Sequence, residues 1–164
     1  MKTYFLILLF FNSLIAIAQT DPSIPPFKRF PSFPPVKLLK ADGSVFDKEA
    51  LSRKSPVMLM LFNPACEHCR QETTELTRNM NLFKKVQIVM ATSAPFDSMI
   101  VFIRNYSLNN FDNIIVGRDE HYFLPTFFRI RNLPFLAFYD KKKGLIDIFE
   151  GAMPIPQIAE IFKK

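Results

Sequence analysis

The sequence predicts an α/β fold in which a central mixed sheet carries helices on both faces. Short apolar runs alternate with longer stretches of helical periodicity along the chain. Such alternation is typical of parallel strands that are joined by helices. Two apolar runs on either side of residues 141–144 predict a β-hairpin near the C-terminus, which adds antiparallel strands to the sheet.

The strands are predicted from apolar runs and from turn signals. Asp42-Gly43 is a hairpin turn signal, so the first two strands form an N-terminal hairpin that extends the fold. Six consecutive apolar residues at 57–62 predict a central strand that is buried on both faces. The expected strands span residues 36–39, 44–46, 57–62, 86–91, 114–116, 135–139 and 145–150.

The helices are predicted from the spacing of apolar residues. In the second helix, Leu76, Met80 and Phe83 recur at i, i+4 and i+7 and share one face. In the last helix, Ile158, Ile161 and Phe162 are expected to point inward. The expected helices span residues 47–51, 69–83, 96–106, 121–128 and 155–164.

Residues 1–18 have the pattern of a secretory signal peptide. Lys2 precedes an apolar stretch, and Ala16-Ile17-Ala18 is a cleavage sequence ahead of Gln19. An uncleaved N-terminal anchor is the alternative, but the apolar stretch is shorter than the roughly 20 residues of a full membrane span. We therefore expect an extracytoplasmic protein, for example in the periplasm, with membrane anchoring as the alternative.

Residues 19–35 contain six prolines and no cysteine. Proline is excluded from helix interiors and central strands, so this segment is expected to be an extended linker. An ordered arm that packs on the domain through Phe27, Phe30 and Phe33 is the alternative. Residues 36–164 are then expected to form one domain, which is long enough to bury a sizeable hydrophobic core.

Basic residues outnumber acidic residues by 21 to 15. The basic residues are scattered, and the only run of three, at residues 141–143, is expected to be a solvated hairpin tip. An exported chain without a basic stripe is not expected to bind nucleic acid. The surplus of positive charge favours contact with anionic envelope surfaces.

The two cysteines of the chain, Cys66 and Cys69, are separated only by Glu67 and His68. A disulfide across two residues closes a very small loop, so it stabilises a fold poorly. A metal site would need two further ligands, and His121 is the only other histidine. We therefore expect a redox-active pair, with no metal and no cofactor.

The position of the pair before a helix predicts different roles for the two thiols. Cys66 lies where unpaired backbone N–H groups and the helix dipole stabilise a thiolate, which is the attacking species. Cys69 follows one helical turn later on the same face and would resolve the mixed disulfide that Cys66 forms.

These features together resemble the thioredoxin superfamily, and more narrowly the exported thiol-disulfide oxidoreductases of the TlpA/ResA type. The resemblance covers residues 36–164. It rests on the leading hairpin, on the strand that runs through Asn63-Pro64-Ala65 into the cysteine pair, on Leu133-Pro134 just before a strand, and on the closing hairpin and helix.

The resemblance implies a thioredoxin-like fold, protein disulfides as substrates, a membrane-bound electron donor and a monomeric protein. It implies a reductase or an isomerase rather than an oxidase. It also implies that Pro134 follows a cis bond, faces the cysteines and, with Leu133, binds the substrate backbone. His68 resembles the oxidising relatives of the DsbA and protein disulfide isomerase kind, whereas Glu67 resembles ResA. The two would shift the redox potential in opposite directions, unless both are merely solvent-exposed.

The sequence departs from the family at three positions. Ala65 stands where the family usually has tryptophan, and Met60 stands where thioredoxins carry a buried acid. Leu133 precedes the expected cis-proline, where threonine or valine is common. These departures concern reaction rate and substrate choice more than fold.

Two other functions on the same fold stay open. A peroxidase of the peroxiredoxin type needs Pro-x-x-x-Thr-x-x-Cys, but Leu59 and Asn63 occupy the first two of those positions. A non-enzymatic metal-delivery or binding module is the other. The copper carriers that look similar have three residues between their cysteines, whereas this chain has two.

Overall fold

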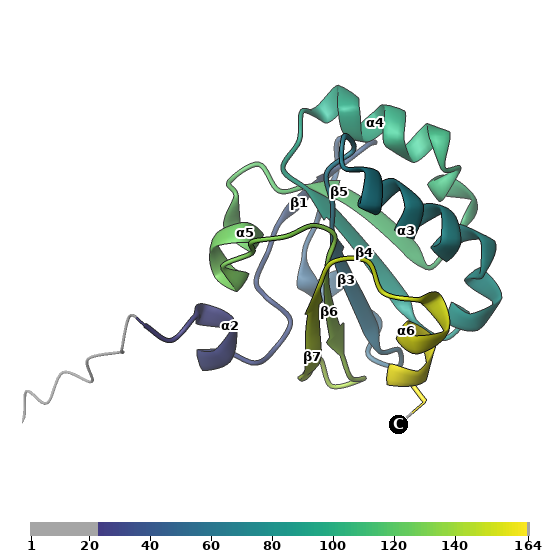
Figure 1. The fold of residues 1–164 in the computed structure, drawn as a ribbon. Helices are drawn as coiled ribbons and strands as arrows, with labels where there is room; N and C mark the ends of the chain where they lie inside the picture. Colours follow the sequence, from purple (N-terminus) through teal and green to yellow (C-terminus); the bar gives the residue numbers. More distant parts are fainter. Residues whose placement is uncertain (1–22, 164) are drawn as a thin grey trace, which may run out of the picture.

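The computed structural model describes residues 23–163, which form a seven-stranded sheet with helices on both faces (Figure 1). The strand order is β2-β1-β5-β4-β3-β6-β7. The strands are β1 (Leu38–Lys40), β2 (Val45–Phe46), β3 (Val57–Leu61), β4 (Gln87–Thr92), β5 (Ile114–Arg118), β6 (Phe135–Tyr139) and β7 (Leu145–Glu150). Strands β3, β4 and β5 are parallel, and β1, β6 and β7 each pair antiparallel with a neighbour. The predicted mixed α/β sheet and its two hairpins are confirmed.

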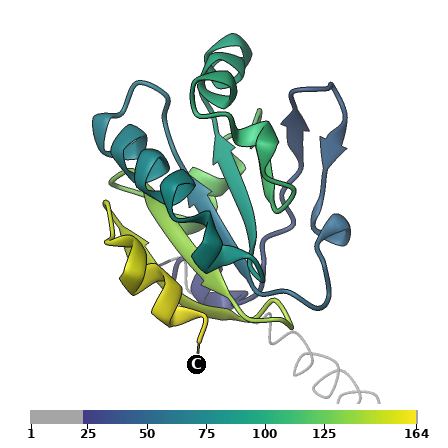
Figure 2. The same ribbon diagram turned by 90° about the vertical axis from the view of Figure 1, so that its right-hand side faces the viewer.

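Four helices follow strands as the sequence predicts: α3 (Glu67–Arg78), α4 (Phe96–Asn105), α5 (Phe123–Phe128) and α6 (Ile155–Ile161). A further short helix, α2 (Pro26–Arg29), precedes the first strand. The helix expected at residues 47–51 is the 3-10 turn η2 (Lys48–Ala50), and two other 3-10 turns are η3 (Met80–Phe83) and η4 (Leu108–Asn110). Figure 2 shows α3 and α6 side by side on one face of the sheet.

Strand β3 lies at the centre of the molecule and separates two apolar clusters. Met58 and Met60 face the cluster that α3, α4 and α6 cover. Leu59 and Leu61 face the cluster that α2 and α5 cover. All five residues of β3 are buried, which explains why the strand is a continuous apolar run in the sequence.

Helix α3 is displaced from the predicted span 69–83. It begins at Glu67, with Cys66 as its N-cap, and it ends at Arg78. The side chain of Asn79 donates a hydrogen bond to the carbonyl of Glu75, so it competes with the backbone bonds that would continue the helix. The 3-10 turn η3 then carries Phe83 into the core, where it is fully buried.

Helix α5 begins at Phe123 rather than at residue 121. Tyr122 has a left-handed backbone with φ of 53°, which helical residues do not adopt. The buried carboxylate of Asp119 accepts hydrogen bonds from the backbone N–H groups of Phe123 and Leu124. This cap fixes where the helix starts.

The described part of the proline-rich segment is ordered. The expectation that it contains no helix is wrong, because Pro26 occupies the first turn of α2, where a missing N–H costs nothing. Phe27 packs on Phe128 with ring centroids 5.7 Å apart, and Phe33 packs on Tyr139 at 5.1 Å. Residues 23–35 therefore lie against the domain as an arm.

Other details of the sequence prediction need correction. Phe30 is 61% exposed and does not help to pack the arm. The last helix ends at Ile161, and Phe162 caps it. The hairpin tip is solvated at Lys141 and Lys142, but Lys143 turns inward and donates to the carbonyls of residues 52 and 55.

The predicted signal peptide, residues 1–18, lies outside the described residues. Within residues 23–163 no helix has the length and apolar character that a membrane crossing needs.

Candidate active site at the start of helix α3

The loop between β3 and α3 is folded by the side chain and backbone of one residue. The Oδ1 atom of Asn63 accepts a hydrogen bond from the backbone N–H of Ala65, at 2.9 Å. The Asn63 carbonyl accepts another from the N–H of Cys66, also at 2.9 Å. These two bonds turn the chain sharply and place Cys66 at the N-cap of α3.

The two cysteines lie one helical turn apart, and both are free thiols. The backbone N–H of Cys69 donates to the Sγ atom of Cys66 over 3.4 Å. This donor and the positive end of the helix dipole favour negative charge on the Cys66 sulfur. The arrangement suits a thiol that reacts as a thiolate.

Cys69 is in a different environment. The residue is fully buried, and the pKa of its thiol is raised to about 12. Burial is the main cause, and the hydrogen bond with Cys66 and the charge on Cys66 contribute to the same shift. At neutral pH Cys69 is therefore a protonated, inaccessible thiol, whereas Cys66 is partly exposed.

The loop before β6 lies beside Cys66, at the same end of the sheet. The peptide bond between Leu133 and Pro134 is cis, which is the geometry that the resemblance implies. The Cys66 thiol donates to the carbonyl oxygen of Leu133 over 3.7 Å. Antiparallel pairing of β3 with β6, in which Leu61 lies opposite Phe135, brings this loop to the cysteines.

Glu67 and His68, predicted to tune the redox potential, lie on the first turn of α3 and are exposed. The Oε1 atom of Glu67 accepts a hydrogen bond from the side chain of Gln71, over 3.4 Å. The His68 side chain makes no hydrogen bond or ion pair to the described residues. Both side chains face solvent beside the cysteine pair, so any influence on the pair acts through charge.

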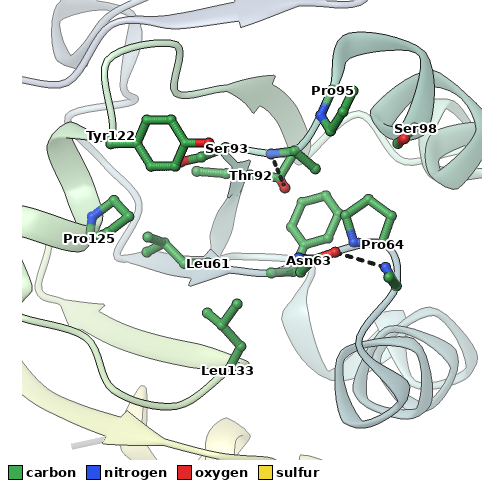
Figure 3. Close-up of a pocket in the computed structure, with 14 residues that line it drawn as sticks. Leu61, Asn63, Pro64, Thr92, Ser93, Pro95, Ser98, Tyr122, Pro125 and Leu133 are labelled. Atoms are coloured by element: carbon green, nitrogen blue, oxygen red, sulfur yellow. Dashed lines mark hydrogen bonds between the residues drawn. The ribbon is translucent and has the colours of Figure 1, made fainter.

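An apolar groove of about 510 Å³ adjoins the Asn63–Pro64 turn (Figure 3). It lies between that turn, the β4–α4 loop and the start of α5. Tyr122, which is 60% exposed, stands at its rim. Leu133 lines the groove and also contacts Cys66 through its carbonyl, so the groove adjoins the cysteine site. The other lining residues include Leu61, Phe62, Ser93, Pro95, Ser98 and Pro125.

A buried acid on α3 was not among the residues predicted from the sequence. Glu72 is only 5% exposed, and burial raises the pKa of its carboxyl group to about 7. Its Oε2 atom accepts a hydrogen bond from the backbone N–H of Met153, whereas its Oε1 atom has no partner among the described residues. The signal was available, because Glu72 lies three residues after Cys69 on the inner face of the helix.

Metal binding has no evident site in the part of the chain that the structure describes. There, no three histidine, cysteine or acidic side chains lie close enough together to hold an ion.

Solved structures similar to this chain include thiol-disulfide proteins. One is a secreted disulfide oxidoreductase of Mycobacterium tuberculosis homologous to Escherichia coli DsbE, with a TM-score of 0.65 and 20% identity, covering 77% of this chain and 93% of that chain. Another is dsbF of the same organism, with a TM-score of 0.66 and 20% identity, covering 77% and 92%. A third is the exposed lipoprotein thioredoxin Etrx1 of Streptococcus pneumoniae, with a TM-score of 0.55 and 21% identity, covering 76% and 96%.

Identities at this level show a shared fold. No curated protein sequence matches the chain. The family model of the thioredoxin-like domain matches residues 33–164, which is most of the sequence and includes both cysteines and the cis-proline loop. The chain therefore belongs to the thioredoxin-like domain family.

Proposed function

We propose that this protein is an exported thiol-disulfide oxidoreductase that exchanges disulfides with envelope proteins. The observation that carries the proposal is the asymmetry of the two thiols. Cys66 is partly exposed at a helix N-cap, and Cys69 is buried one turn behind it. An attacking thiol and a protected resolving thiol need this arrangement.

In the first step, the Cys66 thiolate attacks one sulfur of a substrate disulfide. The Cys66–substrate S–S bond forms while the substrate S–S bond breaks, and the leaving substrate thiolate takes a proton from solvent. The cis-proline loop lies beside the sulfur that reacts, so the Leu133 carbonyl and the groove can hold the substrate chain during attack.

In the second step, Cys69 attacks the Sγ atom of Cys66. Once Cys66 is bonded to substrate, it carries no negative charge and no longer forms its hydrogen bond with the Cys69 thiol. Both of these had raised the pKa of Cys69. Cys69 then loses its proton to solvent more easily. The Cys66–Cys69 disulfide forms, the mixed disulfide breaks, and the substrate leaves as a dithiol with two added electrons.

The enzyme must then be reduced by an external thiol donor, which we propose to be membrane-bound. We favour reduction or isomerisation of substrates over oxidation, in line with the resemblance to the ResA type. The signal-peptide pattern of residues 1–18 supports an extracytoplasmic location, as do the secreted and surface-exposed proteins that share the fold. We propose that the protein works as a monomer.

Turnover of a model protein disulfide, such as insulin, with dithiothreitol as the reductant tests this function. Wild type should accelerate the reduction, and Cys66→Ser should reduce the rate to that of dithiothreitol alone. Cys69→Ser should form the mixed disulfide once and then turn over at least about a hundredfold more slowly. Undiminished turnover by Cys66→Ser would refute the proposed mechanism.

A further inference from the structure

A cluster of lysines lies at the end of the molecule opposite the cysteines, and we name it the lysine face. It is formed by residues from four separate segments of the chain. Its members are Lys54, Lys84, Lys85, Lys141, Lys142 and Lys163, and all six side chains are exposed. They surround two adjoining hollows of about 620 and 440 Å³.

Most of this charge is not neutralised. Only Lys163 has an ion-pair partner in the described part of the chain, the exposed Glu160. The one acidic residue that lines the hollows, Asp140, already accepts a hydrogen bond from the backbone N–H of Gly144. The remaining five lysines are available to a partner.

Apolar side chains lie among these lysines. Leu82 is 45% exposed and Ile146 is 47% exposed, and each lines one of the hollows. Phe162 is half-buried and lines both. Exposed apolar groups among flexible cations fit a bilayer interface, where the charges meet headgroups and the apolar groups enter below them.

The topology places this face away from the chemistry. The lysine face surrounds Pro56, just before β3, whereas Cys66 follows the other end of that strand. A five-residue strand spans about 15 Å. In Figure 1 this end lies at the bottom beside the C-terminus, and the start of α3 lies at the top. If this domain is attached to a partner by its lysine face, Cys66 therefore stays open to substrates.

We propose that the lysine face docks the domain on a membrane surface that carries anionic lipid headgroups. The charge of the face is complementary to such a surface, and the exposed Leu82 and Ile146 supply the apolar contact. Nucleic acid would satisfy the charge but would leave the apolar side chains exposed, and binding of an acidic protein is an outcome that the experiment below distinguishes.

Sedimentation with lipid vesicles tests the proposal. The chain purified from an exporting host is mixed with vesicles of phosphatidylcholine alone, or with vesicles in which about a third of the lipid is phosphatidylglycerol. The neutral vesicles report any binding that does not depend on charge, including binding by the N-terminus. Wild type should bind the anionic vesicles more strongly, and added salt should weaken that binding.

Two variants with the same loss of charge identify the surface. Lys84→Gln/Lys85→Gln/Lys141→Gln removes three cations from the lysine face. Lys37→Gln/Lys48→Gln/Arg104→Gln removes three exposed cations elsewhere on the molecule. Each lysine near an anionic surface changes the partition constant about fivefold, so the first variant should lose about a hundredfold and the second only about twofold.

A separate variant tests the apolar contact. Leu82→Ser should weaken binding to anionic vesicles severalfold at every salt concentration, because the lost contact is not screened. All three variants should retain disulfide exchange, which shows that they are folded.

Three results would overturn the proposal. The first is equal binding of wild type to neutral and anionic vesicles, and the second is an equal loss of binding by the two triple variants. The third is tighter binding of wild type to soluble polyglutamate or duplex DNA than to anionic vesicles at the same salt concentration.

Discussion

The sulfur atom of Cys66 lies 3.7 Å from the carbonyl oxygen of Leu133, although 67 positions separate the two residues in the sequence. Strands β3 and β6 pair antiparallel, and this pairing fixes both residues at the same end of the sheet. The thiol and the cis-proline loop are therefore held together by the most buried strands of the fold. Under the proposed function, a substrate that reaches Cys66 should also contact the Leu133–Pro134 loop.

The two thiols should differ strongly in alkylation. Cys66 is partly exposed, whereas Cys69 is fully buried and its pKa is raised to about 12 by burial and by Cys66. Iodoacetamide added to the reduced protein near neutral pH should label Cys66 at least about a hundredfold faster than Cys69. Peptide mass spectrometry measures both rates, and equal labelling of the folded protein would contradict the assigned environments.

The apolar groove should contribute to binding of protein substrates. Tyr122→Asn removes an exposed aromatic ring from the groove rim while tolerating the left-handed backbone. It should raise KM for a protein disulfide about three- to tenfold, and leave both kcat and the reduction of oxidised glutathione unchanged. Phe30→Asn removes an equally exposed ring outside the groove and is the control. Equal effects of the two variants would exclude the groove as a substrate site.

Glu72 should make the stability of the protein depend on pH. Burial raises its pKa from 4.5 to about 7, so between these values the folded protein holds a proton that the unfolded chain has lost. The stabilising contribution is complete below pH 4.5 and is lost as pH rises through 7. The free energy of unfolding should fall by about 2–3 kcal/mol across this range.

Substitutions of Glu72 and of the nearby Glu75 show which carboxyl group causes the pH dependence of stability. Glu72→Gln should flatten the pH dependence, as measured by urea unfolding at several pH values. Glu75→Gln, which alters an exposed carboxylate on the same helix, should leave most of that dependence in place. If the free energy of unfolding of Glu72→Gln changed with pH as steeply as that of wild type, another group would be responsible.

Gly117 permits the close approach of β5 to β1. A Cβ atom at this position would lie 2.6 Å from the Cβ atom of Leu38, which is fully buried and cannot move aside freely. Gly117→Ala should therefore lower the free energy of unfolding by about 1–3 kcal/mol. Gly144→Ala meets no atom closer than 3.4 Å and should change it much less. Urea unfolding at constant pH compares the two variants. An unchanged free energy of unfolding for Gly117→Ala would show that β1 can shift.

The sequence predicted the elements whose signals are local. The apolar run of β3 and the turn signal Asp42-Gly43 each identify an element from adjacent residues. The end of α3 and the start of α5 were missed, because the side-chain hydrogen bonds of Asn79 and Asp119 decide them. Such bonds override apolar periodicity at helix ends.

The candidate site was predicted only in part for a similar reason. The spacing of Cys66 and Cys69 is visible in the sequence, and the family resemblance supplied Pro134. The groove is not visible, since it combines the β3–α3 turn with Tyr122 and Leu133 from distant loops. The hydrogen bond from Met153 to Glu72 likewise joins α3 to a loop 81 positions away.

Trapping of mixed disulfides in an exporting host tests the central claim most directly. Cys69→Ala removes the resolving thiol, so disulfides between Cys66 and substrate proteins should accumulate. They should appear on non-reducing gels, vanish with dithiothreitol, and be absent from Cys66→Ala/Cys69→Ala. If wild type turns over protein disulfides but Cys69→Ala accumulates no complex through Cys66, the assigned roles of the two cysteines are wrong.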